Sequence, residues 1–285
     1  MGTMLVLVVL TQKGGSGKTT LAGHIAVQAE LSGAGPVAVL DADPQESLAE
    51  WADERTADNP VVAQTSLWQL DGDVRRMRDL GIKLLVIDTP PGITPIIKSA
   101  IAVSDLVLIP VKPSPHDLRA AGKTVGVVEG MGKPVVFVVN CASPWARITS
   151  DAVIALSQHG VVAPVIVHQR ADFASSMIDG RTVMEIARKS PSADEIALLW
   201  VYLNARLTPF EQLAFDPVTE PFEDRVPLPE HLRKVAPGGA GARDPQYDLQ
   251  KQPPIAADPA RIGSPAKAVR LHLRPLRIRE HHSGH

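Results

Sequence analysis

The sequence predicts a three-layer, doubly wound α/β fold in which a mostly parallel sheet lies between helices. Short apolar runs alternate with helical stretches over the first 207 residues. These runs are nearly continuous in Val, Ile and Leu, as expected for strands that helices cover on both faces. Regular strand–helix alternation also favours parallel connections. Strands are expected at 4–11, 37–41, 84–88, 106–111, 135–140 and 162–167, and helices at 18–31, 117–129, 150–159 and 193–207.

Composition excludes several classes of protein. Cys141 is the only cysteine among 285 residues, so the chain holds neither an internal disulfide nor a cysteine pair for a metal, and a reducing, cytoplasmic location is expected. The apolar run at 4–10 is too short to span a bilayer, and no run approaches about twenty residues. The formal net charge of -2 means that any nucleic-acid contact must use a local patch.

Composition and periodicity divide the chain into two parts, an ATPase-like domain at 1–207 and a tail at 208–285. The tail holds 12 of the 25 prolines and no sustained periodicity, which predicts disorder or loose attachment. Its end is basic, with six Lys or Arg residues between 261 and 279. A solvated tail and a contact with an anionic surface are both open interpretations.

The strongest motif follows the first expected strand and opens the first expected helix. It reads Gln-Lys-Gly-Gly-Ser-Gly-Lys-Thr-Thr at 12–20. In this setting glycines allow backbone N–H groups to bind phosphate oxygens, and a helix N-terminus adds positive potential. A nucleotide site is therefore expected to use Gly14, Gly15, Ser16, Gly17, Lys18, Thr19 and Thr20. Lys18 is expected at the β- and γ-phosphates of ATP and the Thr19 hydroxyl on Mg²⁺.

The motif departs from the usual phosphate loop because position 12 is Gln and not Gly. A dinucleotide fold, with Asp41 on a ribose, fails because Thr20 stands where that fingerprint needs a third glycine. The run Lys-Gly-Gly-Ser-Gly-Lys-Thr-Thr resembles the deviant Walker motif of the ParA/MinD family of P-loop ATPases, and especially small plasmid-type ParA partition proteins. The resemblance implies a homodimer that sandwiches ATP, with Lys13 reaching the partner's nucleotide.

Three carboxylates at strand ends extend the resemblance. Asp41 ends the strand at 37–41 and Asp43 follows it, while Asp88 ends the strand at 84–88. By resemblance, Asp43 orients or activates the attacking water, while Asp41 and Asp88 serve the Mg²⁺ site. Asp43 also fits a helix N-cap before residues 45–51. Gly92 is positioned to offer its N–H group to the γ-phosphate.

Two further segments resemble the same family. The turn at 110–117 is expected near the dimer face, without assigned chemistry. Asn140 matches the position that contacts adenine in this family, although capping the next turn remains the other interpretation. ParA-like proteins bind DNA without sequence preference through basic residues in the C-terminal third of the domain. Here the chosen candidates are Arg147, Arg170, Arg188 and Lys189.

The resemblance implies a partition or positioning ATPase. ATP would build a dimer that binds DNA non-specifically on the nucleoid, and a ParB-like or other adaptor would stimulate hydrolysis. The cargo would be a plasmid, a chromosome region or a protein assembly, with no membrane contact. Alternatives are a MinD-like membrane-cycling ATPase, which Pro275 disfavours, a DNA-transfer helper, and a nucleotide-gated binding module with negligible turnover. Missing cysteine pairs exclude an iron–sulfur carrier.

Overall fold

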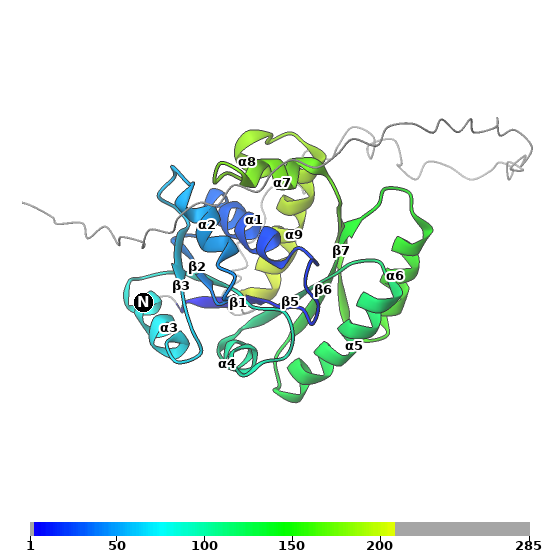
Figure 1. Ribbon diagram of the computed structural model, residues 1–285, viewed down its shortest axis with the longest axis horizontal. Helices are drawn as coiled ribbons and strands as arrows, with labels where there is room; N and C mark the ends of the chain where they lie inside the picture. Colours follow the sequence, from blue (N-terminus) through cyan, green and yellow to red (C-terminus); the bar gives the residue numbers. More distant parts are fainter. Residues whose placement is uncertain (1–2, 209–285) are drawn as a thin grey trace, which may run out of the picture. The chain divides into compact units, whose positions relative to one another are not determined.

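A seven-stranded parallel sheet forms the centre of the protein in the computed structural model, which describes residues 3–208 (Figure 1). The strand order is β3-β2-β4-β1-β5-β6-β7, and every pairing in the described part is parallel. The strands are β1 (Leu5–Val9), β2 (Val37–Asp41), β3 (Val61–Gln64), β4 (Leu84–Asp88), β5 (Leu106–Val111), β6 (Val135–Ala142) and β7 (Val161–His168).

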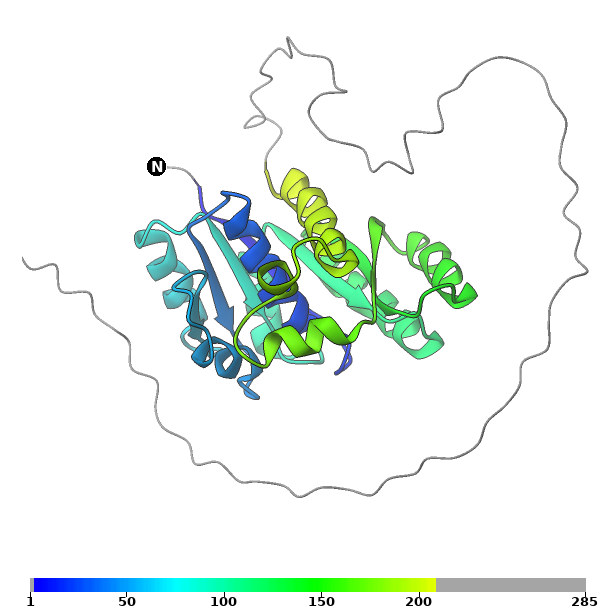
Figure 2. The ribbon, with the colours of Figure 1, turned by 90° about the horizontal axis from the view of Figure 1, so that it is seen from above.

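Helices cover both faces of the sheet, as Figures 1 and 2 show. One face carries α1 (Lys18–Leu31), α2 (Ser47–Asp53), α7 (Ala171–Met177), α8 (Val183–Ile186) and α9 (Pro191–Leu207). The other carries α3 (Leu70–Asp79), α4 (Pro95–Val103), α5 (Pro115–Gly130) and α6 (Arg147–Ser157). Each layer of helices packs its own cluster of apolar side chains against the sheet. The predicted three-layer α/β fold is confirmed.

Element boundaries differ from the sequence expectations for identifiable reasons. The strand β3 was missed because it is short and lies at the sheet edge with both ends exposed, so it lacks a continuous apolar run. Helices α5 and α9 begin two residues earlier than expected, each with a proline in the first turn after a serine cap. Helix α6 begins three residues earlier than expected, and β1 ends at Val9 because the chain then turns into the loop.

The site lies at the carboxyl ends of the central strands. Strand β1 has β4 on one side and β5 on the other, so the chain order reverses beside it. Such switch points are where open α/β sheets bind ligands. The pairing register places Val9 and Asp41 on either side of Asp88. The loop after β1 and the carboxylates at the ends of β2 and β4 therefore meet.

No helix among residues 3–208 is long and apolar enough to cross a membrane. The tail, predicted to begin at residue 208, lies outside the described residues from 209 onward, together with its basic end. Helix α9 ends at Leu207, and the division of the chain at that point stays a prediction.

Candidate nucleotide-binding and active site

The loop between β1 and α1 has the backbone that its glycines predict. Gly15 and Gly17 have φ of +79° and +84°, in the left-handed region that favours glycine. Gly17 is the N-cap of α1, and Lys18 begins the helix. Among residues 3–208 no side chain caps this helix N-terminus, and its first turn contains no acidic residue. The N–H groups of the first turn are therefore available to an anion.

Asn140 holds the loop from behind. Its Nδ2 donates a hydrogen bond to the Ser16 carbonyl at 2.7 Å, and its side chain is buried. A Cβ atom on Gly17 would lie only 2.4 Å from this Nδ2. Neither the adenine contact nor the turn cap considered from the sequence describes this bond. The adenine role remains a prediction. That contact would have to use the second hydrogen of Nδ2 or the side-chain oxygen of Asn140.

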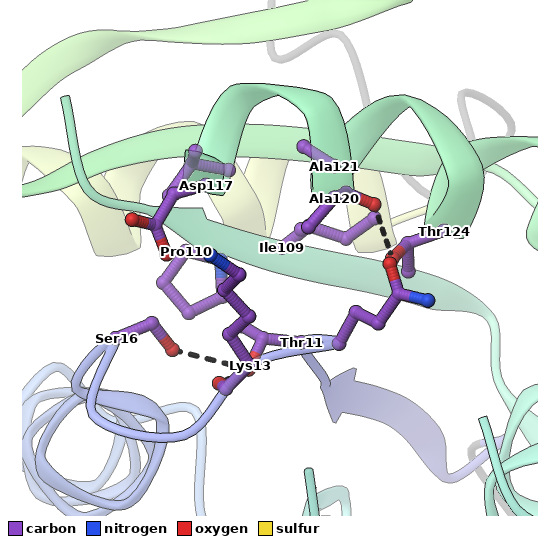
Figure 3. A pocket seen from close by; sticks show the side chains of 11 residues that line it. Thr11, Lys13, Ser16, Ile109, Pro110, Asp117, Ala120, Ala121 and Thr124 are labelled. Carbon is purple, nitrogen blue, oxygen red and sulfur yellow. Dashed lines mark hydrogen bonds between the residues drawn. The ribbon is translucent and has the colours of Figure 1, made fainter. Parts of the chain in front are cut away.

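Lys13 lies at the exposed mouth of the loop. Its side chain points toward Pro110 and the first turn of α5 across a small pocket that Asp117 also lines (Figure 3). Within the loop, Ser16 Oγ donates to Thr11 Oγ1 at 3.1 Å, and Thr11 Oγ1 donates to the Lys13 carbonyl at 2.6 Å. These bonds fix the backbone of Lys13 while its side chain makes no ion pair in residues 3–208.

Thr19 and Asp88 form the centre of the predicted metal site. Thr19 Oγ1 donates to Asp88 Oδ2 at 2.6 Å. Asp88 is fully buried, and this burial raises the pKa of its carboxyl to about 7, against the opposing effects of the Thr19 hydroxyl and the Lys18 charge.

The second oxygen of Asp88 provides a test of whether the site fits a cation. Asp88 Oδ1 is buried and has no hydrogen-bond partner in the described residues. A carboxylate oxygen and a hydroxyl are hard ligands of the kind that Mg²⁺ takes. No group of three or more His, Cys, Asp or Glu side chains in residues 3–208 would hold a metal alone. The residues fit an ion that is completed by phosphate oxygens and water, which is the usual arrangement for Mg²⁺ in nucleotide enzymes.

Asp41 has a structural role that the sequence did not reveal. Its Oδ2 accepts the N–H groups of Leu48 and Ala49 in the first turn of α2, and its Oδ1 accepts the N–H group of Asp43. Burial raises the pKa of Asp41, and these three hydrogen bonds oppose that rise. Asp41 thus satisfies the N-terminal N–H groups of α2 from a distance. Its metal role remains a prediction.

Asp43 is not the helix cap that the sequence allowed. The N-cap of α2 is Glu46, and the helix begins at Ser47. Asp43 Oδ1 instead accepts the N–H group of Gln45 at 3.0 Å in a local turn. Its side chain lines a groove of about 570 Å³ between the loop after β2, the loop after β3 and the start of α4. Asp43 is therefore accessible to solvent.

The N–H group of Gly92, expected at the γ-phosphate, is donated to the Thr11 carbonyl at 3.1 Å. Gly92 has φ of +95°. The loop after β4 is thus tied to the start of the phosphate loop, and a phosphate contact would require that bond to break.

The DNA candidates occupy different settings. Arg147 is exposed at the first position of α6, and Arg188 and Lys189 are exposed between α8 and α9. Arg170 instead makes two hydrogen bonds to Glu195, at 2.6 and 2.8 Å. The same carboxylate accepts the N–H group and Nδ1 of His168. A phosphate would have to compete with Glu195 for Arg170.

Sequence reasoning missed one residue beside the loop and one within α1. Lys112 was included in the turn at 110–117 without a role, yet its ammonium lies beside Gly15. A lysine directly after the strand next to β1 is the signal that would have found it. His24, fully buried in α1, was not considered at all.

Comparisons with known proteins identify the family of the chain. Residues 7–183 match the CobQ/CobB/MinD/ParA nucleotide-binding domain. Maintenance of carboxysome distribution protein A of Halothiobacillus neapolitanus is 31% identical over 202 residues, covering 67% of this chain and 92% of that protein.

Two solved structures have the same fold. McdA(D38A) of Cyanothece in complex with ATP has a TM-score of 0.59 at 17% identity, over 73% of this chain and 97% of that one. MinD of Pyrococcus horikoshii OT3, complexed with Mg-ADP, has a TM-score of 0.61 at 14% identity, over 71% and 96%. The fold, the phosphate loop and the family match lead to one conclusion: the chain belongs to the ParA/MinD family of nucleotide-binding ATPases.

Proposed function

We propose that this protein is a positioning ATPase that dimerises around ATP, binds DNA without sequence preference and is released when an adaptor stimulates hydrolysis. The observation that carries the proposal is the exposed Lys13 beside a loop whose helix N-terminus is free for phosphate. A lysine at that position can reach out of its own protomer. The name of the Halothiobacillus relative favours a large protein assembly as cargo, and a plasmid or chromosome region is the other candidate.

The chemistry would be displacement at the γ-phosphorus. A water oxygen bonds to phosphorus while the bond to the ADP oxygen breaks, and the water proton passes to solvent or to a base. Asp43 is accessible and would orient this water, and Lys18, Thr19 and Asp88 would hold the phosphate end of the substrate. When bound, Mg²⁺ would neutralise phosphate charge, with Thr19 and Asp88 as its protein ligands. Positioning and charge neutralisation are most of what this reaction requires.

Two substitutions separate binding, dimerisation and turnover. Asp43→Ala should abolish hydrolysis while leaving ATP binding intact, so that an ATP-bound dimer accumulates on DNA. Lys13→Ala should abolish ATP-dependent dimerisation in size-exclusion chromatography. Asp53→Ala and Lys123→Ala change an exposed acid and an exposed lysine outside the site and serve as controls. Wild-type hydrolysis by Asp43→Ala, or dimerisation by Lys13→Ala, would contradict the proposal.

DNA binding is tested by comparing ATP, ADP and no nucleotide at two salt concentrations. We expect binding with ATP only, falling steeply with salt because phosphate contacts release counterions. Changing both Arg188 and Lys189 to Ala should weaken binding uniformly across sequences and reduce the salt slope by about 2. Lys83→Ala, an exposed lysine just before β4, is the matched control. Equal binding with ATP and ADP would refute a nucleotide-gated DNA contact.

A further inference from the structure

Lys112 occupies a fixed position at the carboxyl end of β5. Val111 pairs with Val139 of β6, so Lys112 follows the strand beside Asn140. The Lys112 carbonyl accepts the Ser114 N–H group at 2.7 Å, and Pro113 restricts the backbone next to it. Ser114 in turn accepts the Asp117 N–H group at 3.2 Å as the cap of α5. The backbone of Lys112 is therefore anchored on both sides.

The ammonium group of Lys112 lies over the phosphate loop. Its Nζ atom is 3.9 Å from the position that a Cβ atom on Gly15 would take. On the neighbouring strand, Cys141 Sγ lies 3.6 Å from the corresponding position on Gly17. Burial raises the pKa of the Cys141 thiol, and the positive charge of Lys112 opposes that rise. The distance places the charge of Lys112 beside Gly15, and its effect on Cys141 agrees with that position.

Lys112 has no anionic partner in residues 3–208. It makes none of the ion pairs of the described part, and its ammonium donates no hydrogen bond there. The residue is half-buried, as expected for a lysine whose stem packs while its ammonium reaches water. This ammonium can therefore contact an anion that binds at the loop. The adjacent loop also attracts anions, through its backbone N–H groups and its helix N-terminus.

We propose that Lys112 binds the polyphosphate of a nucleoside di- or triphosphate in its own protomer. It would be a third lysine of the site, beside Lys18 at the start of α1 and Lys13 at the mouth of the loop. This inference rests on the proposed ATP binding and adds a binding residue to it. A charged hydrogen bond of this kind changes affinity about 10- to 100-fold. Figure 3 shows how closely the end of β5, at Pro110, approaches the loop.

The test measures equilibrium binding of Mg-ATP and Mg-ADP to the full chain, by displacement of a fluorescent nucleotide. Lys112→Gln should weaken ATP binding about 10- to 100-fold, and Lys112→Arg, which keeps the charge, should stay close to wild type. Lys123→Gln on α5 removes the same charge from an exposed site and should not change affinity. Repeating the series with Lys13→Ala, which removes the proposed dimer, should give the same loss.

Ionic strength separates an electrostatic role from a merely structural one. High salt should reduce the difference between wild type and Lys112→Gln, because screening weakens the contact in the wild type only. Thermal melting without nucleotide checks that Lys112→Gln is folded. ATP affinity within about twofold of wild type, or a loss that disappears with Lys13→Ala, overturns the inference; a twofold change is about 0.4 kcal/mol, well below a charged hydrogen bond. A wild-type chain that binds no nucleotide would instead refute the proposed function.

Discussion

His24 should make the stability of this domain depend on pH. The residue is fully buried in α1, with its ring edge-on to Phe173. Its Nδ1 lies 2.7 Å from the Thr20 carbonyl, and its Nε2 is 3.3 Å from the Val183 nitrogen. With Nδ1 protonated, Nε2 accepts the Val183 N–H group. A second proton would bring two donors face to face, so the fold selects the neutral ring.

The size and sign of the effect follow from the pKa. Burial lowers the pKa of His24 from 6.5 to about 4, although the Thr20 carbonyl, Glu185 and Asp172 favour the charged form. Between these two values the unfolded chain binds a proton that the folded chain does not, so stability falls as pH decreases from about 6.5 toward 4. The full shift corresponds to about 3 kcal/mol, and the loss between pH 7 and pH 5 is about 2 kcal/mol.

The assay compares urea unfolding of the wild type and His24→Gln at pH 7, 6 and 5 without nucleotide. Glutamine does not titrate, and its side-chain oxygen can still accept from Val183. The variant should be less stable by about 1 kcal/mol at pH 7, for one imperfect hydrogen bond. By pH 5 the order should reverse, because only the wild type has lost about 2 kcal/mol. Carboxylates such as Asp172 and Glu185 are common to both proteins and cancel in the difference.

A core change without a titrating group provides the control. Ile25→Val lies on the same helix and is fully buried, so it should cost about 1 kcal/mol equally at every pH. The expected change in the difference between the unfolding free energies of wild type and His24→Gln is about 2 kcal/mol from pH 7 to pH 5. If that difference stays constant within about 0.5 kcal/mol, the inference that His24 is buried in its neutral form is wrong.

Three other substitutions test the site geometry. Gly17→Ala should reduce ATP affinity at least about tenfold, because it strains a left-handed backbone by about 1–2 kcal/mol and displaces Asn140 from the loop. The control Gly72→Ala lies in open space on α3 and should slightly stabilise the fold. Asp41→Ala should lower the free energy of urea unfolding by about 2 kcal/mol even in EDTA, because capping needs no metal; a purely metal-binding Asp41 would leave that energy unchanged. Arg170→Ala should lower the unfolding free energy by about 1–3 kcal/mol through its lost pair with Glu195, and an Arg170 held only for DNA would lose DNA affinity without losing stability.

The parts of the site that could be predicted are those that the sequence specifies locally. The glycines, Lys18 and Thr19 occupy consecutive positions between a strand and a helix, so their spacing alone sets the loop. Asp88 closes a continuous apolar run, and parallel strands bring such ends to one edge. The bond between Thr19 and Asp88 then follows from the strand order β4-β1.

The parts that could not be predicted depend on contacts between distant segments. The bond from Asn140 to Ser16 joins residues 124 positions apart, and it depends on where the strand order places β6 relative to the loop. Asp41 caps α2 only because the chain turns sharply after β2, which no periodicity reveals. Arg170 looked like a free surface cation because its partner Glu195 comes from another helix.

The groups that the fold leaves without protein partners are the groups that a magnesium nucleotide would satisfy. Asp88 Oδ1 is buried and unpaired, Lys112 is half-buried without an anion, and the first turn of α1 has no side-chain cap within the described residues. The unpaired buried oxygen of Asp88 costs free energy in the protein alone. Mg-ATP at about 100 times its Kd should therefore raise the unfolding free energy by about 2.7 kcal/mol. Mg²⁺ alone should raise it far less, because Thr19 and Asp88 are too few ligands without phosphate oxygens. Equal stabilisation by Mg²⁺ with and without ATP would mean that the protein alone supplies a complete metal site. It would also mean that the phosphate loop does not bind the phosphates of ATP.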